Sequence, residues 1–234
     1  MLSFREINQK RKKNYQESYL FDLTRFCSLP FTYLFYRMPL TPNMISMLSF
    51  MVLLVACGFI VIATPLATMI GGILCWFSWV FDCVDGEIAR LKGLSSDFGA
   101  WFDGALDRLG DIFLFGAITI NLYQHSPSLI VVIVGLLATV STTLWRLNAL
   151  YTKTTLHLPL TEKEPLKRVG FDTATMYVII SLGLIFNTIG FKAAIAEWHI
   201  DITALFAVML FFAVIINLVT LKNIITTYVR HARQ

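Results

Sequence analysis

Charged residues are scarce in this chain: only 15% of its 234 residues are Asp, Glu, Lys or Arg, whereas 56% are hydrophobic. The mean hydropathy is +0.68. An ordinary soluble domain carries about 25% charged residues, so the composition excludes that class of protein. The apolar residues come in runs of roughly 20, which is about the length of one bilayer crossing. We therefore expect an all-α, polytopic membrane protein.

Paired cysteines are absent as well. The four cysteines, at positions 27, 57, 75 and 83, form no C-x-x-C pair, and three of them lie in apolar runs. We interpret them as small buried side chains rather than as disulfide partners or metal ligands.

The N-terminal segment lacks the apolar stretch of a cleavable signal peptide. Residues 1–18 carry basic side chains instead, which either face anionic lipid headgroups or form a solvated tail. Residues 19–38 are aromatic and apolar, and Pro30 disfavours a single straight span, so we expect a helix in the membrane interface that breaks or continues at Pro30. This divides the chain into residues 1–40, the tail and interfacial helix, and residues 41–234, a membrane domain.

Six membrane-spanning helices are expected in that domain. Thr41 can cap the first of them, and Pro42 suits its first helical position. The predicted spans cover residues 42–63, 67–91, 97–123, 128–150, 172–190 and 201–225.

Basic residues are nearly missing from one side of this arrangement. The three connections at 63–68, 122–128 and 190–200 contain one of the 19 Lys and Arg residues, Lys192. By the positive-inside rule, both termini and the 92–97 loop face the cytoplasm. We expect an integral protein of the cell membrane with its active site on the cytoplasmic side.

Four carboxylates interrupt the apolar runs between positions 82 and 107. Asp82 and Asp85 are three residues apart and Asp103 and Asp107 four apart, so each pair shares one face of a helix. Ionised groups at membrane depth are costly and are functional by default. Carboxylate oxygens suit Mg²⁺ or Mn²⁺, and two such ions could clamp a pyrophosphate. The stretch therefore predicts a metal site, with two ions as the expected number.

This stretch resembles the signature of the CDP-alcohol phosphotransferases, also called CDP-alcohol phosphatidyltransferases. It reads D-x-x-D-G-x-x-A-R and, eight residues later, G-x-x-x-D-x-x-x-D. The fixed positions are filled by Asp82, Asp85, Gly86, Ala89, Arg90, Gly99, Asp103 and Asp107.

The resemblance implies the chemistry and the roles of these residues. A CDP-activated alcohol donates its phosphate-linked group to the hydroxyl of a second, polar alcohol, and CMP is released. The four aspartates would hold the divalent metal, and Asp107 would also act as the base. Asp82, Gly86, Ala89, Arg90 and Gly99 would contact the CDP moiety. The resemblance further implies a homodimer.

Several other charged residues are candidates for contacts near the site. Cations that could bind the acceptor are Arg146, followed by Arg25, Lys153, Lys167 and Arg168. An arginine within the membrane needs an anionic partner, and a phosphate on the acceptor could be that partner for Arg146. Alternatively, the Arg146 side chain extends to the lipid headgroups on the cytoplasmic side. We expect Glu87 to be solvated and Asp111 to pair with Arg108, three residues before it.

Three functions remain open from the sequence. The first is a phospholipid synthase that uses a CDP-diacylglycerol-type donor. The second is an enzyme like the di-inositol phosphate synthases, which use soluble CDP-inositol and an inositol phosphate; residues 22–43 resemble that branch loosely. The third, of another class, is a divalent-cation transporter with carboxylates along its pathway. Membrane lipids are expected partners, and nucleic acid is not.

Overall fold

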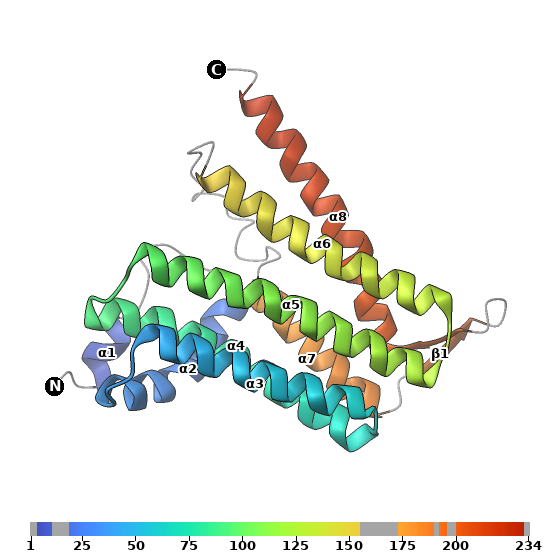
Figure 1. Ribbon diagram of the computed structural model, residues 1–234, viewed down its shortest axis with the longest axis horizontal. Helices are drawn as coiled ribbons and strands as arrows, with labels where there is room; N and C mark the ends of the chain where they lie inside the picture. The colour runs from blue at the N-terminus through green and yellow to red at the C-terminus, as the bar shows by residue number, and fades with distance from the viewer. Residues whose placement is uncertain (1–3, 11–18, 155–172, 190–191, 196–199, 232–234) are drawn as a thin grey trace.

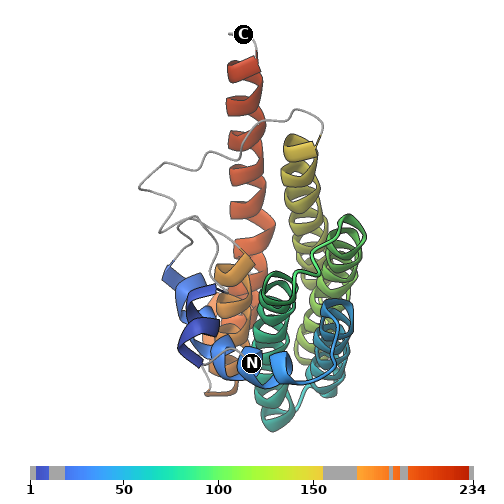
Figure 2. The ribbon, with the colours of Figure 1, turned by 90° about the vertical axis from the view of Figure 1, so that its left-hand side faces the viewer.

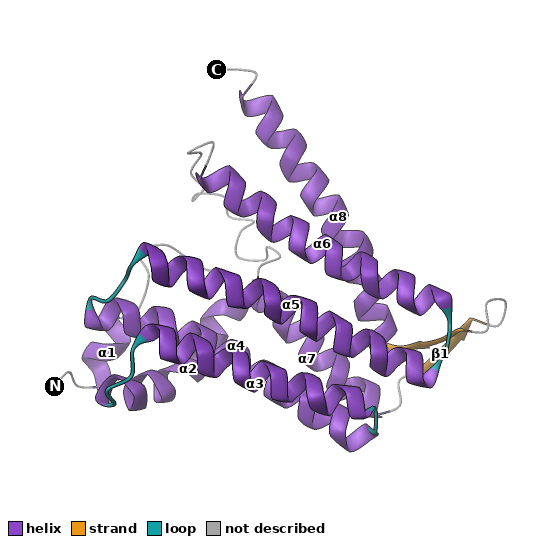
Figure 3. Cartoon of the chain, viewed as in Figure 1, coloured by secondary structure: helices purple, strands orange, loops and turns teal. Residues whose placement is uncertain are grey.

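The computed structural model of the chain describes residues 4–10, 19–154, 173–189, 192–195 and 200–231, most of them in helices (Figures 1 and 3). The helices are α1 (Phe4–Lys10), α2 (Tyr19–Arg37), α3 (Pro42–Ile62), α4 (Pro65–Lys92), α5 (Asp97–His125), α6 (Leu129–Thr154), α7 (Thr173–Ile189) and α8 (Ala204–His231). Two short antiparallel strands, β1 (Lys192–Ile195) and β2 (Ile200–Thr203), pair between α7 and α8.

Side-chain caps fix where the central helices begin. Thr41, Thr64 and Ser96 are the N-caps of α3, α4 and α5, and each side chain accepts a hydrogen bond from a backbone N–H in the first turn. The two threonines precede a proline at the first helical position, as the sequence predicted for Thr41. At the other end of α4, Gly93 adopts φ 66°, a conformation that favours glycine, and stops the helix.

Three helices of alternating direction form the centre of the molecule. α3 packs against both α4 and α5, α7 packs against α4, and α6 packs against α5 and α8 (Figures 1 and 2). The α2–α3 connection and the α4–α5 loop lie at one end of this bundle, whereas the α3–α4 turn, the α5–α6 turn and the hairpin lie at the other. The short α1 and the longer α2 lie beside α4 at the first end.

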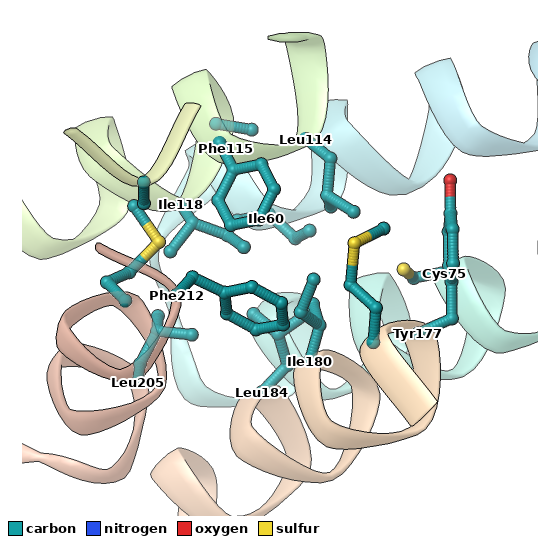
Figure 4. Close-up of a cluster of buried hydrophobic side chains, with 14 of the residues drawn as sticks. Ile60, Cys75, Leu114, Phe115, Ile118, Tyr177, Ile180, Leu184, Leu205 and Phe212 are labelled. Carbon is teal, nitrogen blue, oxygen red and sulfur yellow. The ribbon is translucent and has the colours of Figure 1, made fainter. Parts of the chain in front are cut away.

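Large apolar side chains fill the space where α5, α7 and α8 meet (Figure 4). Phe115 and Phe212 are fully buried, and their rings meet edge to face with centroids 5.3 Å apart. Cys57, Cys75 and Cys83 are buried free thiols, which confirms their interpretation as core side chains, whereas Cys27 is a free thiol that is only half-buried.

Four helices are long and apolar enough to cross a membrane, within the described part of the chain. They are Pro42–Ile62, Pro65–Lys92, Leu129–Asn148 and Leu205–Thr226. α5 is as long as these helices, but its acidic residues lower its hydropathy. The apolar segment of α7, Thr175–Phe186, is shorter than the four spans. The prediction of a helical membrane protein is confirmed at this level.

Two local features differ from the sequence-based expectation, and a third resolves an alternative that the sequence left open. Residues 4–10 form a helix inside the segment expected to be a tail, and its Ile7 is fully buried. The sequence left open whether the helix over residues 19–38 breaks at Pro30, and α2 continues through this proline as one helix. The 190–200 connection contains strand residues, so the fold is not purely helical; Ile195, Ile200 and Ile202 are β-branched residues that favour this pairing.

Candidate metal and nucleotide site

Three carboxylates converge where α4 ends and α5 begins. One oxygen each of Asp82, Asp85 and Asp103 lies within 4.8 Å of the others. Asp85 is buried, and the other two are half-buried. Ser46 of α3 donates a hydrogen bond of 2.5 Å to Asp85 Oδ2 and thereby fixes one of its oxygens. The predicted convergence of the two aspartate pairs therefore holds for these three residues.

This group fits a divalent cation. Among the described residues, no ion pair joins Asp82, Asp85 or Asp103 to a basic side chain. Three neighbouring carboxylates in a half-buried place repel one another, and a hard cation that prefers oxygen ligands relieves that repulsion. Mg²⁺ and Mn²⁺ both belong to this class, and Ser46 is the kind of outer partner that orients a ligating carboxylate.

Asp107, the fourth predicted ligand, lies outside this group of three and contacts Arg146. Arg146 Nη1 donates to Asp107 Oδ2 at 2.7 Å, and Arg146 Nε lies 2.8 Å from Asp111 Oδ2. Asp111 is fully buried. The expected pairing of Asp111 with Arg108 is wrong, because the Arg108 guanidinium turns back to the carbonyl of Gly104 on its own helix.

A pocket of about 280 Å³ opens beside the carboxylates, between the starts of α3 and α5 and the end of α4. Four of the five residues predicted to contact CDP line it: Gly86, Ala89, Arg90 and Gly99. At Gly99 a Cβ atom would lie 3.1 Å from Ser96 Oγ, so a larger side chain would intrude on the pocket wall.

A smaller cavity of about 20 Å³ continues the site toward the interior. It shares Ser46 and Asp103 with the larger pocket and is also lined by Asp82, Asp107 and Tyr177. Asp82, which was predicted to contact both metal and CDP, therefore borders this inner cavity, whereas Asp85 borders the outer one.

Sequence reasoning missed several polar residues of the pocket. Asn43 and Ser46 come from the first turns of α3, and Ser95 and Ser96 come from the loop before α5. Asn43 directly follows Thr41 and Pro42 at the start of α3 but was not among the predicted site residues. Ser46 follows one turn later on the same helix face, which is the signal that could have identified it.

The remaining predicted cations lie in different places. Arg25 is 6% exposed and contacts Glu87, which is fully buried; the expectation that Glu87 is solvated is therefore wrong. Lys153 belongs to the last turn of α6, but its side chain lies outside the described residues, as does all of Arg168 and Lys167.

Named relatives share parts of this sequence. The bifunctional IPC transferase and DIPP synthase of Aquifex aeolicus is 33% identical over 82 residues, which are 35% of this chain and 18% of that protein. The phosphatidylinositol phosphate synthase of Corynebacterium glutamicum is 32% identical over 96 residues, 38% of this chain and 40% of that protein. In these matches the chain spans less than half the length of either relative.

Solved structures share the fold. The crystal structure of Mycobacterium tuberculosis phosphatidylinositol phosphate synthase with CDP-DAG bound has a TM-score of 0.67 at 19% identity, covering 86% of this chain and 93% of that one. The structure of the same enzyme with manganese and citrate gives a TM-score of 0.67 at 19% identity, covering 86% and 88%.

The family model described as CDP-alcohol phosphatidyltransferase matches residues 39–229, most of the chain and all of the acidic signature. This agrees with the resemblance predicted from the eight fixed residues. The chain belongs to the CDP-alcohol phosphatidyltransferase family.

Proposed function

We propose that this protein is a membrane CDP-alcohol phosphotransferase of phospholipid biosynthesis. It moves a phosphate-linked group, most simply a phosphatidyl group from a CDP-diacylglycerol-type lipid, onto the hydroxyl of a polar alcohol and releases CMP. The observation that carries this proposal is the position of Asp82, Asp85 and Asp103, within 4.8 Å of one another and next to a pocket lined by Gly86, Ala89, Arg90 and Gly99.

The CDP moiety is bound by five of the signature residues in this proposal. Asp82, Gly86, Ala89, Arg90 and Gly99 bind the CDP moiety, with the Arg90 guanidinium as the cationic partner of a phosphate. Gly86, Ala89, Arg90 and Gly99 line one pocket together with Asp85 and Asp103 of the acidic group, which supports this assignment. Asp82 borders the adjoining inner cavity.

Asp82, Asp85, Asp103 and Asp107 hold one or two divalent ions, Mg²⁺ or Mn²⁺. Such ions, when bound, neutralise charge on the pyrophosphate oxygens. Asp107 takes the proton of the acceptor hydroxyl, whose oxygen then bonds to the phosphorus that carries the diacylglycerol. The bond from that phosphorus to the bridging oxygen breaks, and CMP leaves with the electron pair. The exposure of the Asp107 side chain, 23%, and its place in the inner cavity support this role.

The acceptor binds on the side of Arg146 in this scheme. Arg146 contacts Asp107 directly, so an anionic acceptor held there would bring its hydroxyl close to the base. Arg25, Lys153 and Arg168 remain weaker predictions for acceptor contacts, since Arg25 already contacts Glu87.

A lipid donor is favoured by the surroundings of the pocket. Leu94 lines the pocket and is half exposed, and Phe98 and Trp101 on the first turns of α5 are 61% and 66% exposed. Exposed apolar side chains at this place suit the acyl chains of a lipid whose head group occupies the pocket. The synthase of M. tuberculosis with the same fold has been solved with CDP-DAG bound.

A soluble donor is the second candidate within the family. The relatives of A. aeolicus and Archaeoglobus fulgidus are named bifunctional IPC transferase and DIPP synthase, and the latter is 37% identical over 87 residues. This is the specific observation in favour of CDP-inositol with an inositol phosphate as acceptor.

A cation transporter is disfavoured by the packing beyond the site. One turn past Asp111, the interior is filled by Leu114, Phe115 and Ile118, all fully buried. Cations crossing at this place would meet closely packed apolar side chains instead of oxygen ligands.

We further propose six membrane spans, with α5 and α7 as the two that composition alone does not identify. α7 has 17 residues, about 26 Å of helix, against a hydrocarbon core of about 30 Å. The three connections poor in basic residues lie together at the end of the bundle far from the site (Figure 1). This supports both termini and the site on the cytoplasmic side, with residues 1–40 as an interfacial unit before the 41–234 membrane domain. A homodimer completes the proposal.

The test is CMP release by the purified chain in detergent with Mg²⁺ or Mn²⁺. CDP-diacylglycerol and CDP-inositol are each supplied with serine, glycerol 3-phosphate, inositol, inositol 1-phosphate or choline. Metal-dependent release with the lipid donor and one acceptor supports the first candidate and names the product. Release only with CDP-inositol favours the second, and metal flux through reconstituted vesicles without CMP release contradicts both.

A further inference from the structure

A buried acidic side chain outside the metal group joins α4 to α2. Glu87 is fully buried, and three side chains of α2 contact its carboxylate. Arg25 Nη1 donates to Oε1 at 3.3 Å, Ser28 Oγ donates to Oε1 at 3.1 Å, and Thr32 Oγ1 donates to Oε2 at 2.5 Å. Arg25 is itself 6% exposed, so the ion pair lies away from water.

Aromatic rings also join α2 to α4. Phe31 of α2 meets Phe81 of α4 edge to face with centroids 5.2 Å apart, and Phe35 lies 5.8 Å from the same ring. An ionised carboxylate in such surroundings is stable only with its partners in place, because its desolvation is costly.

Glu87 projects from the back of the helix that carries the metal site. At 100° per residue, it points about 160° away from Asp85 and about 140° away from Asp82. Ser46 of α3 holds Asp85 on the front of α4, at 2.5 Å. α4 is thus fixed by hydrogen bonds on two opposite faces at nearly the same level along its axis.

We propose that Glu87 is a positioning residue for the metal site and acts through Arg25, Ser28 and Thr32 of α2. The inference rests on the proposed function for the identity of that site. Side-chain atoms lie about 5–6 Å from a helix axis, so a 10° rotation of α4 displaces the Asp82 and Asp85 oxygens by about 1 Å. Metal–ligand distances tolerate about 0.2 Å. Tight metal binding by Asp82 and Asp85 therefore requires that the opposite face of α4, which carries Glu87, is held in place.

The test measures metal binding without any substrate. Mn²⁺ is titrated into the purified full chain in detergent, and free Mn²⁺ is followed by electron paramagnetic resonance. Glu87→Gln is expected to weaken Mn²⁺ binding about tenfold, the lower end of the loss that follows removal of a direct hydrogen-bond partner of a metal ligand. Thr32→Val removes one hydrogen bond to Glu87 and no charge, so it is expected to weaken Mn²⁺ binding by a smaller factor. This variant tests the inference if Glu87→Gln does not fold.

A control at the far end of the bundle separates positioning from general loss of stability. Asn121 is 1% exposed and donates to the Ile60 carbonyl at 2.7 Å and to Thr68 Oγ1 at 3.1 Å, so it also ties buried helices together. Asn121→Leu is expected to lower the melting temperature while leaving Mn²⁺ affinity unchanged. The double variant Arg25→Met/Glu87→Gln removes both charges and is expected to bind Mn²⁺ more tightly than Arg25→Met alone.

The outcomes separate the inference from the proposed function. Glu87→Gln or Thr32→Val protein with wild-type Mn²⁺ affinity overturns the inference alone, and so does an equal loss in Asn121→Leu. Wild-type protein that binds no Mn²⁺ overturns the metal site and the inference with it. Weakening confined to the Glu87 and Thr32 variants supports the inference.

Discussion

Replacing Arg146 by methionine is predicted to destabilise the protein strongly. Arg146 is the cation that α6 contributes to α5, and its side chain is 10% exposed while that of Asp111 is 0% exposed. Removing the guanidinium leaves Asp111 as a buried carboxylate without this partner. Breaking a buried ion pair from one side costs about 3–5 kcal/mol.

That free energy corresponds to a large change in melting temperature. For a chain of 150–250 residues, each kcal/mol lowers Tm by about 2–4 °C, so Arg146→Met is expected to melt about 6–20 °C below the wild type. Thermal unfolding in detergent, followed by the loss of the monodisperse peak in size-exclusion chromatography, measures the difference.

A neighbouring arginine provides the matched control. Arg108 lies one turn before Asp111 on α5, but its guanidinium bonds to the backbone of Gly104 and not to an acidic side chain among the described ion pairs. Arg108→Met is expected to cost about 1 kcal/mol or less. In the double variant Arg146→Met/Asp111→Leu, the unpaired carboxylate is gone, so part of the lost Tm is recovered. Arg146→Met protein that melts within about 2 °C of the Arg108→Met control would refute the reasoning.

Three further variants probe the site itself. Ser46→Ala removes the hydrogen bond to Asp85 and is expected to raise the Mg²⁺ concentration for half-maximal CMP release about tenfold; an unchanged Mg²⁺ dependence contradicts this. Gly99→Val places atoms in the pocket wall, where a Cβ would already be 3.1 Å from a neighbouring oxygen, so CMP binding measured by calorimetry is lost; retained binding disproves the pocket assignment. Asp107→Asn slows transfer at least about 100-fold while CDP-alcohol still binds; normal turnover rules out Asp107 as the base.

The elements that carry the site were predictable because their signals are local. A threonine followed by proline marks the start of α3, and Ser96 precedes the first turn of α5, so short-range capping determines where the helices begin. The spacing of Asp82, Asp85 and Asp103 on two consecutive helices was enough to expect a common group of carboxylates. Local geometry therefore predicted the group of carboxylates, whereas the residues of the pocket lining were predicted from the resemblance to the family.

The partners of charged residues were harder to predict, because they depend on which helices become neighbours. Asp111 has Arg108 three residues before it, yet the cation that reaches it comes from α6, 35 residues later. Glu87 was expected to be solvated, although Arg25, Ser28 and Thr32 form a polar stripe at helical spacing in an otherwise apolar segment. Such a stripe indicates a buried polar partner but does not say on which helix it lies.

The most direct measurement of the central claim is CMP release from CDP-diacylglycerol by the wild-type chain, with Mg²⁺ and after its removal by a chelator. The account predicts that release requires both the metal and an acceptor alcohol, and that Asp85→Asn abolishes it while Asp97→Asn, an exposed acidic residue at the start of α5, does not. Release that persists without divalent metal, or that survives in Asp85→Asn, would contradict the assignment of the acidic group as the active site.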